Sequence, residues 1–148
     1  MIRIQHQDFD LNALYTDLKQ HNLHAGAIVT FTGLVRDFNQ GNDVTGLFLE
    51  HYPGMTERTL EAIIEQAKER FFVDRVDVIH RVGQLSLGDQ IVYVGVSSQH
   101  REEAFDCAQY VMDYLKKQAP FWKKETTTHA DVWLTPADKD QTAYLNWE

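Results

Sequence analysis

Pairs of β-rich segments that follow one another without a helix between them constrain the fold of this chain most strongly. Residues 26–36 and 44–52 form one such pair, and residues 75–83 and 90–98 form another. Strands joined directly by a loop pair antiparallel, whereas parallel strands need a long crossover connection, usually a helix. With helical segments between the pairs, the order is roughly β-α-β-β-α-β-β-α-β-β. We therefore expect a single α+β domain with a mainly antiparallel sheet and about three helices packed on it.

Three segments have the apolar spacing of amphipathic helices, namely residues 10–20, 56–71 and 100–119. The apolar face of the second consists of Leu60, Ile63, Ile64, Ala67 and Phe71. The core-facing residues expected in the third are Ala104, Phe105, Ala108, Val111, Met112 and Leu115. Asp10 and Thr56 are predicted N-caps, because their side-chain oxygens can accept from the free backbone N–H groups of a first turn. Pro120 is expected to end the third helix.

Two hairpins are expected from the remaining pattern. Residues 26–36 and 44–52 predict one, with a long polar tip at residues 37–43, and residues 121–127 and 130–134 predict the other. Residues 84–89 are predicted to be a loop. The segment from Pro136 onward is polar until two aromatic residues near its end, and no pattern places it.

The composition restricts the functional classes. A length of 148 residues suits one domain, residues 1–148. The formal net charge of −8 disfavours a general nucleic-acid or anionic membrane surface, so any anion site must be local. No apolar run reaches the ~18 residues of a membrane span, and the N-terminus lacks the apolar stretch of a signal peptide. Cys107 is the one cysteine, which suits a reducing compartment, and we expect a cytoplasmic protein.

Lysines are concentrated in one short stretch of this acidic chain. Within LKKQAPFWKKE, residues 115–125, Lys116, Lys117, Lys123 and Lys124 fall within nine positions. A structural interpretation is that cations are favourable at a helix C-terminus and common on strand edges. A functional interpretation is that the turn at Pro120 folds the lysine pairs toward each other, where their charge favours a visiting anion. The residues alone leave both open.

Two further groups could bind anions. His100 and Arg101 stand at a predicted helix start, where free N–H groups already favour negative charge. Arg36 ends a β-rich segment, and its guanidinium can form paired hydrogen bonds with a phosphate or a carboxylate. Each also has a plain structural explanation, as part of a helix end or a solvated strand end.

The chain has no evident nucleophile and no evident metal site. No two histidines have the i, i+4 spacing with a nearby acid that a zinc site on a helix requires. Cys107 lies mid-helix beside the apolar face, so we expect it to be buried rather than reactive. Phosphate-binding loops and serine-nucleophile motifs are missing. We therefore expect no metal and no cofactor.

Five segments together resemble the large, catalytic subunit of molybdopterin synthase. They are GAIVTFTGLVRD, LEHYPGMTE, VIHRVGQL, GDQIVYVGVSSQHREEAF and MDYLKKQAPFWKKE, in the order and at the separations of that family. The resemblance is close over residues 26–125 and weaker outside them. It implies a sulfurtransferase of molybdenum cofactor biosynthesis, which adds two sulfurs to cyclic pyranopterin monophosphate to form the dithiolene of molybdopterin.

The resemblance also implies partners and an assembly. The sulfur would arrive as a thiocarboxylate at the Gly-Gly C-terminus of a small ubiquitin-like subunit. Two large subunits would form a central homodimer with a small subunit at each end, which makes a heterotetramer. A sulfur carried by the partner would explain why the chain has no nucleophile of its own.

The same resemblance implies roles for particular residues. Lys116 and Lys123 match the family's catalytic lysines. The implied substrate-binding residues are Val35, Arg36, His100, Arg101, Lys124 and Glu125. The chain departs from the family at Leu34, where lysine is frequent, and no residue near the C-terminus matches a family arginine.

Two functions of other classes remain alternatives. A binding module without catalysis would hold a phosphorylated metabolite or an acidic peptide through the same lysines. A single-stranded RNA-binding protein would stack bases on Phe121 and Trp122 beside those lysines, although the net charge weighs against it.

The implied roles create a geometric conflict. Fifteen helical residues at ~1.5 Å each separate Arg101 from Lys116 by about 22 Å. A small pterin cannot touch both in one chain, so we expect a pocket shared across a two-fold dimer.

Overall fold

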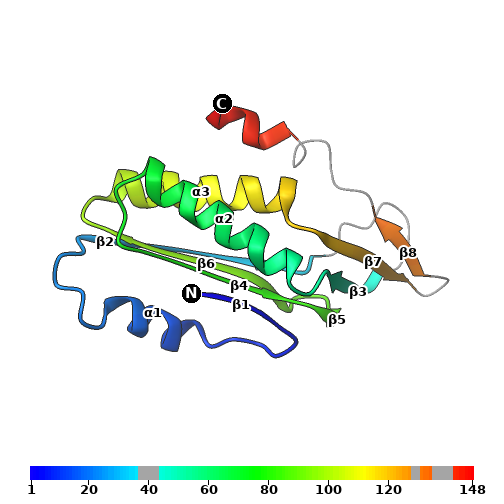
Figure 1. The fold of residues 1–148 in the computed structure, drawn as a ribbon. Helices are drawn as coiled ribbons and strands as arrows, with labels where there is room; N and C mark the ends of the chain where they lie inside the picture. Colours follow the sequence, from blue (N-terminus) through cyan, green and yellow to red (C-terminus); the bar gives the residue numbers. More distant parts are fainter. Residues whose placement is uncertain (37–43, 128–130, 135–141) are drawn as a thin grey trace.

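The computed structural model describes residues 1–36, 44–127, 131–134 and 142–148. Over these residues the chain forms two four-stranded sheets with helices packed on them (Figure 1). The elements are β1 (Ile2–Gln5), α1 (Leu11–Lys19), β2 (Ala27–Leu34), β3 (Val44–His51), α2 (Met55–Arg70), β4 (Arg75–Arg81), β5 (Gly83–Ser86), β6 (Gln90–Ser98), α3 (Arg101–Gln118), β7 (Phe121–Thr127), β8 (Asp131–Leu134) and the 3-10 helix η1 (Ala143–Trp147). The expected α+β class with mainly antiparallel strand pairs is confirmed.

The larger core lies between the first sheet and two helices. This sheet has the order β1-β4-β6-β2; β1 and β4 pair in parallel, and the other described pairs are antiparallel. Helices α2 and α3 cover one face, while α1 lies on the other (Figure 1). The predicted apolar face of α2 is confirmed, because all its members are buried in one cluster with residues of β4, β6 and α3.

The second sheet has the order β5-β3-β7-β8 and is antiparallel throughout its described pairs. Its inward side contributes Leu47, Leu49 and Leu85 to a smaller core that Val35 completes. The predicted hairpin of residues 121–127 and 130–134 is confirmed as the pair β7 and β8. Strand β7, which carries the second lysine pair, is therefore an inner strand of this sheet.

The predicted hairpin of residues 26–36 and 44–52 is wrong. Strand β2 pairs with β6 in the first sheet, whereas β3 pairs with β5 and β7 in the second. Both strands pair with segments that are distant in the sequence, so their adjacency along the chain did not decide their partners. The predicted loop at residues 84–89 is also partly wrong, because β5 occupies Gly83–Ser86. The predicted loop at 37–43 lies outside the described residues.

The helix starts agree with the sequence in one case and differ in another. Asp10 caps α1 as predicted, since its carboxylate accepts from the backbone N of Asn12 at 2.9 Å and of Ala13 at 3.2 Å. Thr56 is not the cap of α2. Gly54 takes that position with a φ of 86°, a left-handed conformation that favours glycine. Thr56 instead lies inside the first turn with its hydroxyl engaged elsewhere.

The prediction for Phe105 in α3 is also wrong. It was expected to face the core, but 60% of its surface is exposed, and Met112 is only partly buried. The buried face of α3 includes Tyr110 and Tyr114; Phe105 lies outside it, whereas Met112 packs against the core at its margin. Apolar periodicity alone does not separate a core-facing position from one at the margin of the buried face.

The C-terminal residues, which the sequence did not place, pack on the helices. Trp147 donates from Nε1 to Oδ2 of Asp113 at 2.7 Å, and its ring lies 5.6 Å from the Arg70 guanidinium. Tyr114 donates from its hydroxyl to a carboxylate oxygen of Glu148 at 2.9 Å. Helix η1 therefore covers the outer side of α3, and its aromatic residues extend the larger core.

Candidate active site

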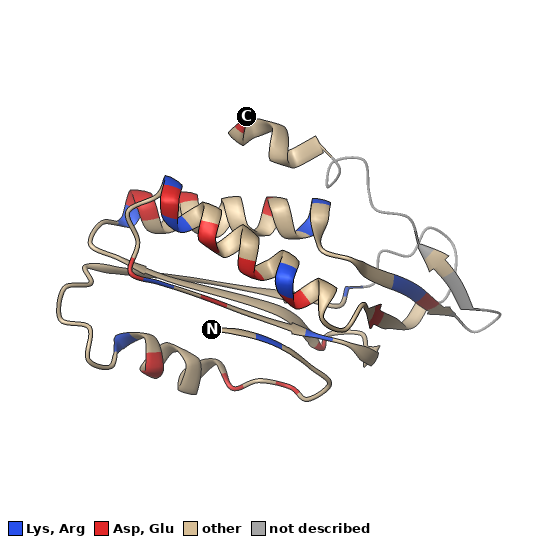
Figure 2. Cartoon of the chain, in the orientation of Figure 1, with Lys and Arg blue, Asp and Glu red and all other residues tan. Residues whose placement is uncertain are grey.

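The end of α3 and the start of β7 bring Lys116 and Lys123 to the same end of the molecule. Lys116 lies in the last turn of α3, which ends at Gln118 before Pro120, as predicted. Figure 2 shows basic residues at the end of α3 and along β7. Both ammonium groups lie close enough to His80 for their charge to lower the pKa of its imidazole. The two predicted catalytic lysines therefore both lie near His80.

His80 is a buried and neutral ring, with 4% of its surface exposed. Its Nδ1 lies 2.8 Å from the backbone oxygen of Arg81. Because a carbonyl oxygen can only accept, Nδ1 donates and Nε2 carries no proton in the neutral ring. Burial lowers the pKa of His80 to about 3; the hydrogen bond to the Arg81 carbonyl oxygen opposes this shift, and the positive charges of Lys123 and Lys116 add to it.

The turn between the two lysines is held from two sides. His80 stacks on Phe121, with ring centroids 3.9 Å apart and planes 18° apart. From α2, the Thr56 hydroxyl donates to the backbone oxygen of Pro120 at 3.2 Å and accepts from the backbone N of Tyr52 at 3.0 Å. These contacts fix the path of the chain between the end of α3 and the start of β7.

Strand β7 directs Lys123 and Glu125 inward. Lys123 is paired with Leu49 and Glu125 with Leu47, and both leucines are buried. Directly paired residues of an antiparallel sheet share a face. The structure therefore brings these two candidate residues to the same side of the second sheet.

Lys124 lies on the opposite side of the sheet, because successive side chains of a strand alternate. Its Nζ is 5.1 Å from the centre of the Phe48 ring and 5.4 Å from that of Trp133. The structure thus separates the Lys124 side chain from that of Lys123. A role for Lys124 in binding the same substrate stays a prediction.

Val35 and Arg36 connect the first sheet to this site. Val35 is buried beside Leu49, the partner of Lys123 in the sheet, and its backbone N donates to the backbone oxygen of Asp89 at 2.8 Å. Arg36 follows it and is exposed. These two candidate residues therefore lie at the end of the molecule that carries Lys116 and Lys123.

His100 and Arg101 lie at the opposite end of α3. His100 is the N-cap residue, without a capping hydrogen bond from its side chain, and Arg101 is the first helical residue. Helix α3 runs unbroken from Arg101 to Gln118, so about 22 Å separates Arg101 from Lys116 at ~1.5 Å per residue. One chain does not bring these residues together with the lysines.

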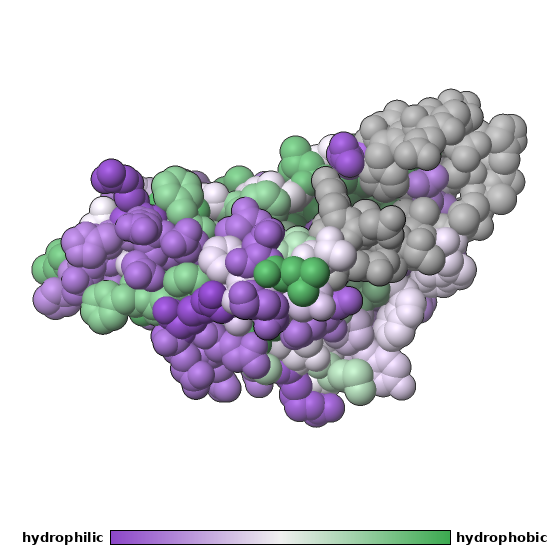
Figure 3. Space-filling view, turned by 90° about the horizontal axis from the view of Figure 1, so that it is seen from above, coloured by the Kyte–Doolittle hydropathy of each residue, from purple (hydrophilic) through white to green (hydrophobic). Residues whose placement is uncertain are grey.

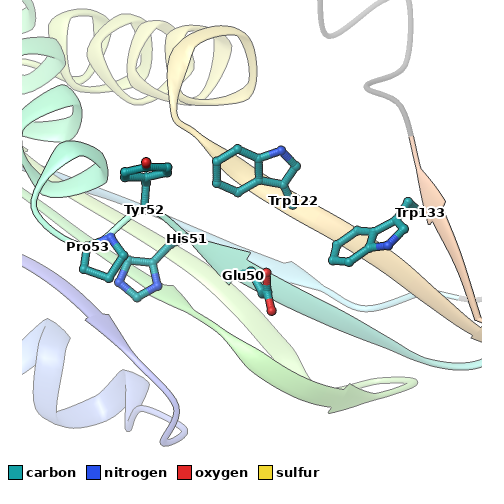
Figure 4. A pocket seen from close by; sticks show the side chains of 6 residues that line it. All are labelled: Glu50, His51, Tyr52, Pro53, Trp122 and Trp133. Carbon is teal, nitrogen blue, oxygen red and sulfur yellow. The ribbon is translucent and has the colours of Figure 1, made fainter.

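An open pocket on the second sheet went unrecognised in the sequence. It has a volume of about 430 Å³ and is lined by Glu50, His51, Tyr52, Pro53, Trp122 and Trp133 (Figure 4). The rings of Tyr52 and Trp122 lie 5.8 Å apart. The sequence feature that could have indicated this pocket is the presence of Tyr52 in HYPG and Trp122 in PFW. Only the pairing of β3 with β7 brings these two residues together.

The described residues contain no reactive thiol. Cys107 is fully buried, as predicted, and burial raises its pKa to about 12. The thiolate is the nucleophilic form, so this cysteine is inert at neutral pH. Among the residues that the structure describes, no cluster of His, Cys, Asp and Glu could hold a metal ion. No helix in these ranges has the length and apolar character needed to cross a membrane.

Lys117 differs from its neighbour Lys116. One residue, or about 100° of helix, separates them, and the Lys117 ammonium lies 5.2 Å from the centre of the Tyr144 ring in η1. We expect Lys117→Ala to retain activity within about twofold, as is usual for exposed positions, and to lose up to about 1 kcal/mol of stability with the cation–π contact. Initial rates and thermal melting would check both values. A loss of activity equal to that of Lys116→Ala would contradict this assignment.

Comparisons with known proteins show what this chain is similar to. The MoaE protein family model matches residues 4–118. A molybdopterin synthase catalytic subunit from Pasteurella multocida is 53% identical over 147 residues, which are 99% of this chain and 97% of that protein.

Two solved structures share the fold. The molybdopterin biosynthesis MoaE protein from Burkholderia ambifaria has a TM-score of 0.85 and 47% identity, covering 99% of this chain and 97% of that one. Molybdopterin synthase from Staphylococcus aureus has a TM-score of 0.83 and 30% identity, covering 89% and 95%. The similarity therefore continues past residue 118 and extends over β7.

Proposed function

Because this chain belongs to the MoaE protein family, we propose that it is the catalytic subunit of a molybdopterin synthase. The reaction is sulfur transfer from the C-terminal thiocarboxylate of a small ubiquitin-like subunit to cyclic pyranopterin monophosphate. The observation that carries this proposal is the placement of Lys116 in the last turn of α3 and of Lys123 near the start of β7, on either side of the turn at Pro120 and near the neutral His80. The two lysine cations suit a reaction between anions. Because the described residues contain no reactive thiol, one of these reactants must bring its own nucleophile.

The chemistry follows from the charges. The substrate phosphate and the thiocarboxylate are both anions, and ammonium groups between them offset their repulsion. The thiocarboxylate sulfur bonds to a pterin carbon while the bond from that carbon to a phosphate oxygen breaks, and the oxygen leaves with a proton. Water then adds to the acyl carbon and the acyl carbon–sulfur bond breaks, so that the sulfur stays on the pterin as a thiolate and the partner leaves as a carboxylate. The lysines stabilise the oxyanion that forms when water adds. Lys116 is suited to give a proton to a departing phosphate oxygen.

The direct test combines the protein with a thiocarboxylated small subunit and cyclic pyranopterin monophosphate. Mass spectrometry should detect a product with two added sulfurs. A binding module without catalysis would instead be stabilised thermally by the pterin and yield no product. The RNA-binding alternative is weakened by the fold, since Phe121 is stacked on His80 and unavailable to a base.

We also propose that the complete site needs a second copy of the chain. His100 and Arg101 lie at one end of α3 and Lys116 at the other. A two-fold axis beside the middle of α3 would reverse the partner helix and place the partner's helix start next to Lys116. The site would then form twice in the homodimer.

A stripe on α3 fits such an axis. Arg101, Phe105, Gln109, Met112 and Lys116 follow one side of the helix at spacings of three and four residues, and none of them is buried. In an antiparallel helix pair centred between residues 108 and 109, Arg101 faces Lys116 and Phe105 faces Met112. This pairing would cover the exposed Phe105, which packing within the described residues does not explain.

The edge of the first sheet supports the same axis. Among the described residues β2 pairs with β6 on one side and with no strand on the other. Phe31 on this edge is 41% exposed and lies on the face that α2 and α3 cover, because it is paired with Val94 of that face. On this side of the molecule, hydrophobic residues reach the surface between hydrophilic ones (Figure 3). Free strand edges readily pair with a second chain. Strand β6 runs antiparallel to β2, and α3 follows β6 and runs back in the opposite direction, so α3 and β2 run in the same direction. A two-fold axis at the middle of β2 would therefore also lie beside the middle of α3.

A disulfide experiment tests this interface independently of activity. Thr30 lies near the middle of β2 and is exposed. Opposite residues in an antiparallel pair have Cβ atoms about 4.5–5.5 Å apart, so Thr30→Cys should form a covalent dimer under mild oxidation. Arg3→Cys on β1, at the other edge of the same sheet, is the matched control and should remain uncrosslinked. If the protein is dimeric in solution and neither variant crosslinks, the interface lies elsewhere.

A further inference from the structure

We propose that His80 is a positioning residue of the candidate site, and that its stack on Phe121 sets the placement of Lys123 relative to Lys116. The inference rests on the proposed function and extends it to a residue for which the sequence analysis gave no role. His80 does not need to touch the substrate for this role. It acts through the backbone that carries the two lysines.

The location of the stack supports this role. His80 is on β4 of the first sheet, while Phe121 is the first residue of β7 in the second sheet and is paired with His51 of β3. The ring contact therefore ties the two sheets together at the point where β7 begins. Lys123 follows two residues later, so a shift of Phe121 would shift Lys123 directly.

The chemistry of the ring supports it as well. The hydrogen bond from Nδ1 to the backbone oxygen of Arg81 fixes the rotation of the imidazole, and the planes of the two rings are nearly parallel. A protonated ring would add a further positive charge beside Lys116 and Lys123. Burial keeps the ring uncharged, so it can lie near the two lysines without repelling them.

A second contact, from Thr56, restrains the backbone of the same turn. The Thr56 hydroxyl holds the Pro120 carbonyl oxygen, and the backbone N of Phe121 donates to the Ala119 carbonyl oxygen at 2.9 Å. These backbone contacts leave the Phe121 ring without a restraint of its own. His80 provides that restraint from the other side. With both contacts in place, the turn has one path, and the two lysines keep a constant separation.

The test compares His80→Ala, which removes the stack, with His80→Phe, which keeps a flat ring. A displacement of about 1 Å at a reacting group can cost up to about a hundredfold in rate. We expect His80→Ala to lower kcat by about ten- to a hundredfold with little change in KM for the thiocarboxylated partner, and His80→Phe to restore most of kcat. Rates are measured at a temperature where each variant is folded.

Val76→Ala is the matched control. Val76 lies on the same face of β4 as His80, four residues earlier, and is equally buried, but it contacts the helices away from the lysines. It should lower the melting temperature while kcat stays at the wild-type value. A loss of kcat in Val76→Ala as large as in His80→Ala would show that general destabilisation explains both, and would overturn the proposal.

Amide hydrogen exchange gives a readout that does not depend on turnover. Amides of residues 121–125 should exchange faster in His80→Ala and return to wild-type protection in His80→Phe. Unchanged kcat in His80→Ala, or a fully protected His80→Phe that remains as slow as His80→Ala, would overturn the stacking role. A wild-type protein that yields no sulfurated product would instead refute the proposed function, and the exchange measurement would still decide whether the stack positions β7.

Discussion

Lys116→Ala and Lys123→Ala should each reduce sulfurated product by at least ten- to a hundredfold while the fold survives. Losing one charge-assisted hydrogen bond to an anion costs about 1.5–3 kcal/mol, which corresponds to that factor. If Lys116 is also the proton donor, its loss adds a further factor of about 10² to 10⁴. Product formation under saturating partner and pterin is the measurement.

The two variants should differ in stability. Lys116 is exposed at the end of α3, so its removal should leave the melting temperature nearly unchanged. Lys123 is partly buried on the inward side of β7 and contributes its aliphatic stem to packing, so Lys123→Met is the better variant for keeping that contact. Near-normal turnover by folded Lys116→Ala or Lys123→Met would refute the catalytic assignment. Lys117→Ala provides the neighbouring lysine control.

Mixing inactive Lys116→Ala with inactive Arg101→Ala should restore activity once subunits exchange. In a mixed dimer with shared sites, one site carries both defects and the other carries neither. Random pairing makes about half of the dimers mixed, so about a quarter of all sites should be intact. The expected recovery is therefore about a quarter of the wild-type rate, well above either parent.

The control for this experiment is the mixture of each variant with itself, taken through the same exchange. Exchange itself is followed with a mass-tagged copy, so that absent recovery can be interpreted. If tagged dimers form and the rate stays at the level of the parents, the lysines and Arg101 do not share a site. His100 and Arg101 would then have to be removed from the proposed pocket.

The local features of this protein follow from its sequence. The apolar face of α2, the Asp10 cap, the end of α3 before Pro120 and the burial of Cys107 were all predicted from neighbouring residues, and the structure confirms them. Each depends on periodicity or on hydrogen bonds within a single turn, which are encoded over a few residues. The lysine cluster was equally visible, because it is contiguous in the sequence.

The arrangement of these elements was decided by tertiary structure. The separation of β2 and β3 into different sheets, the stack of His80 on Phe121 and the docking of Trp147 on Asp113 all join residues far apart in the chain. Such pairings depend on which surfaces are left to be buried after every element has formed, and no local pattern contains that information. The sequence alone determined where the helices form and where positive charge gathers. Only the packed sheets decided that Lys123 faces inward and Lys124 outward, because strand alternation orders the two sides while burial selects which side is inside.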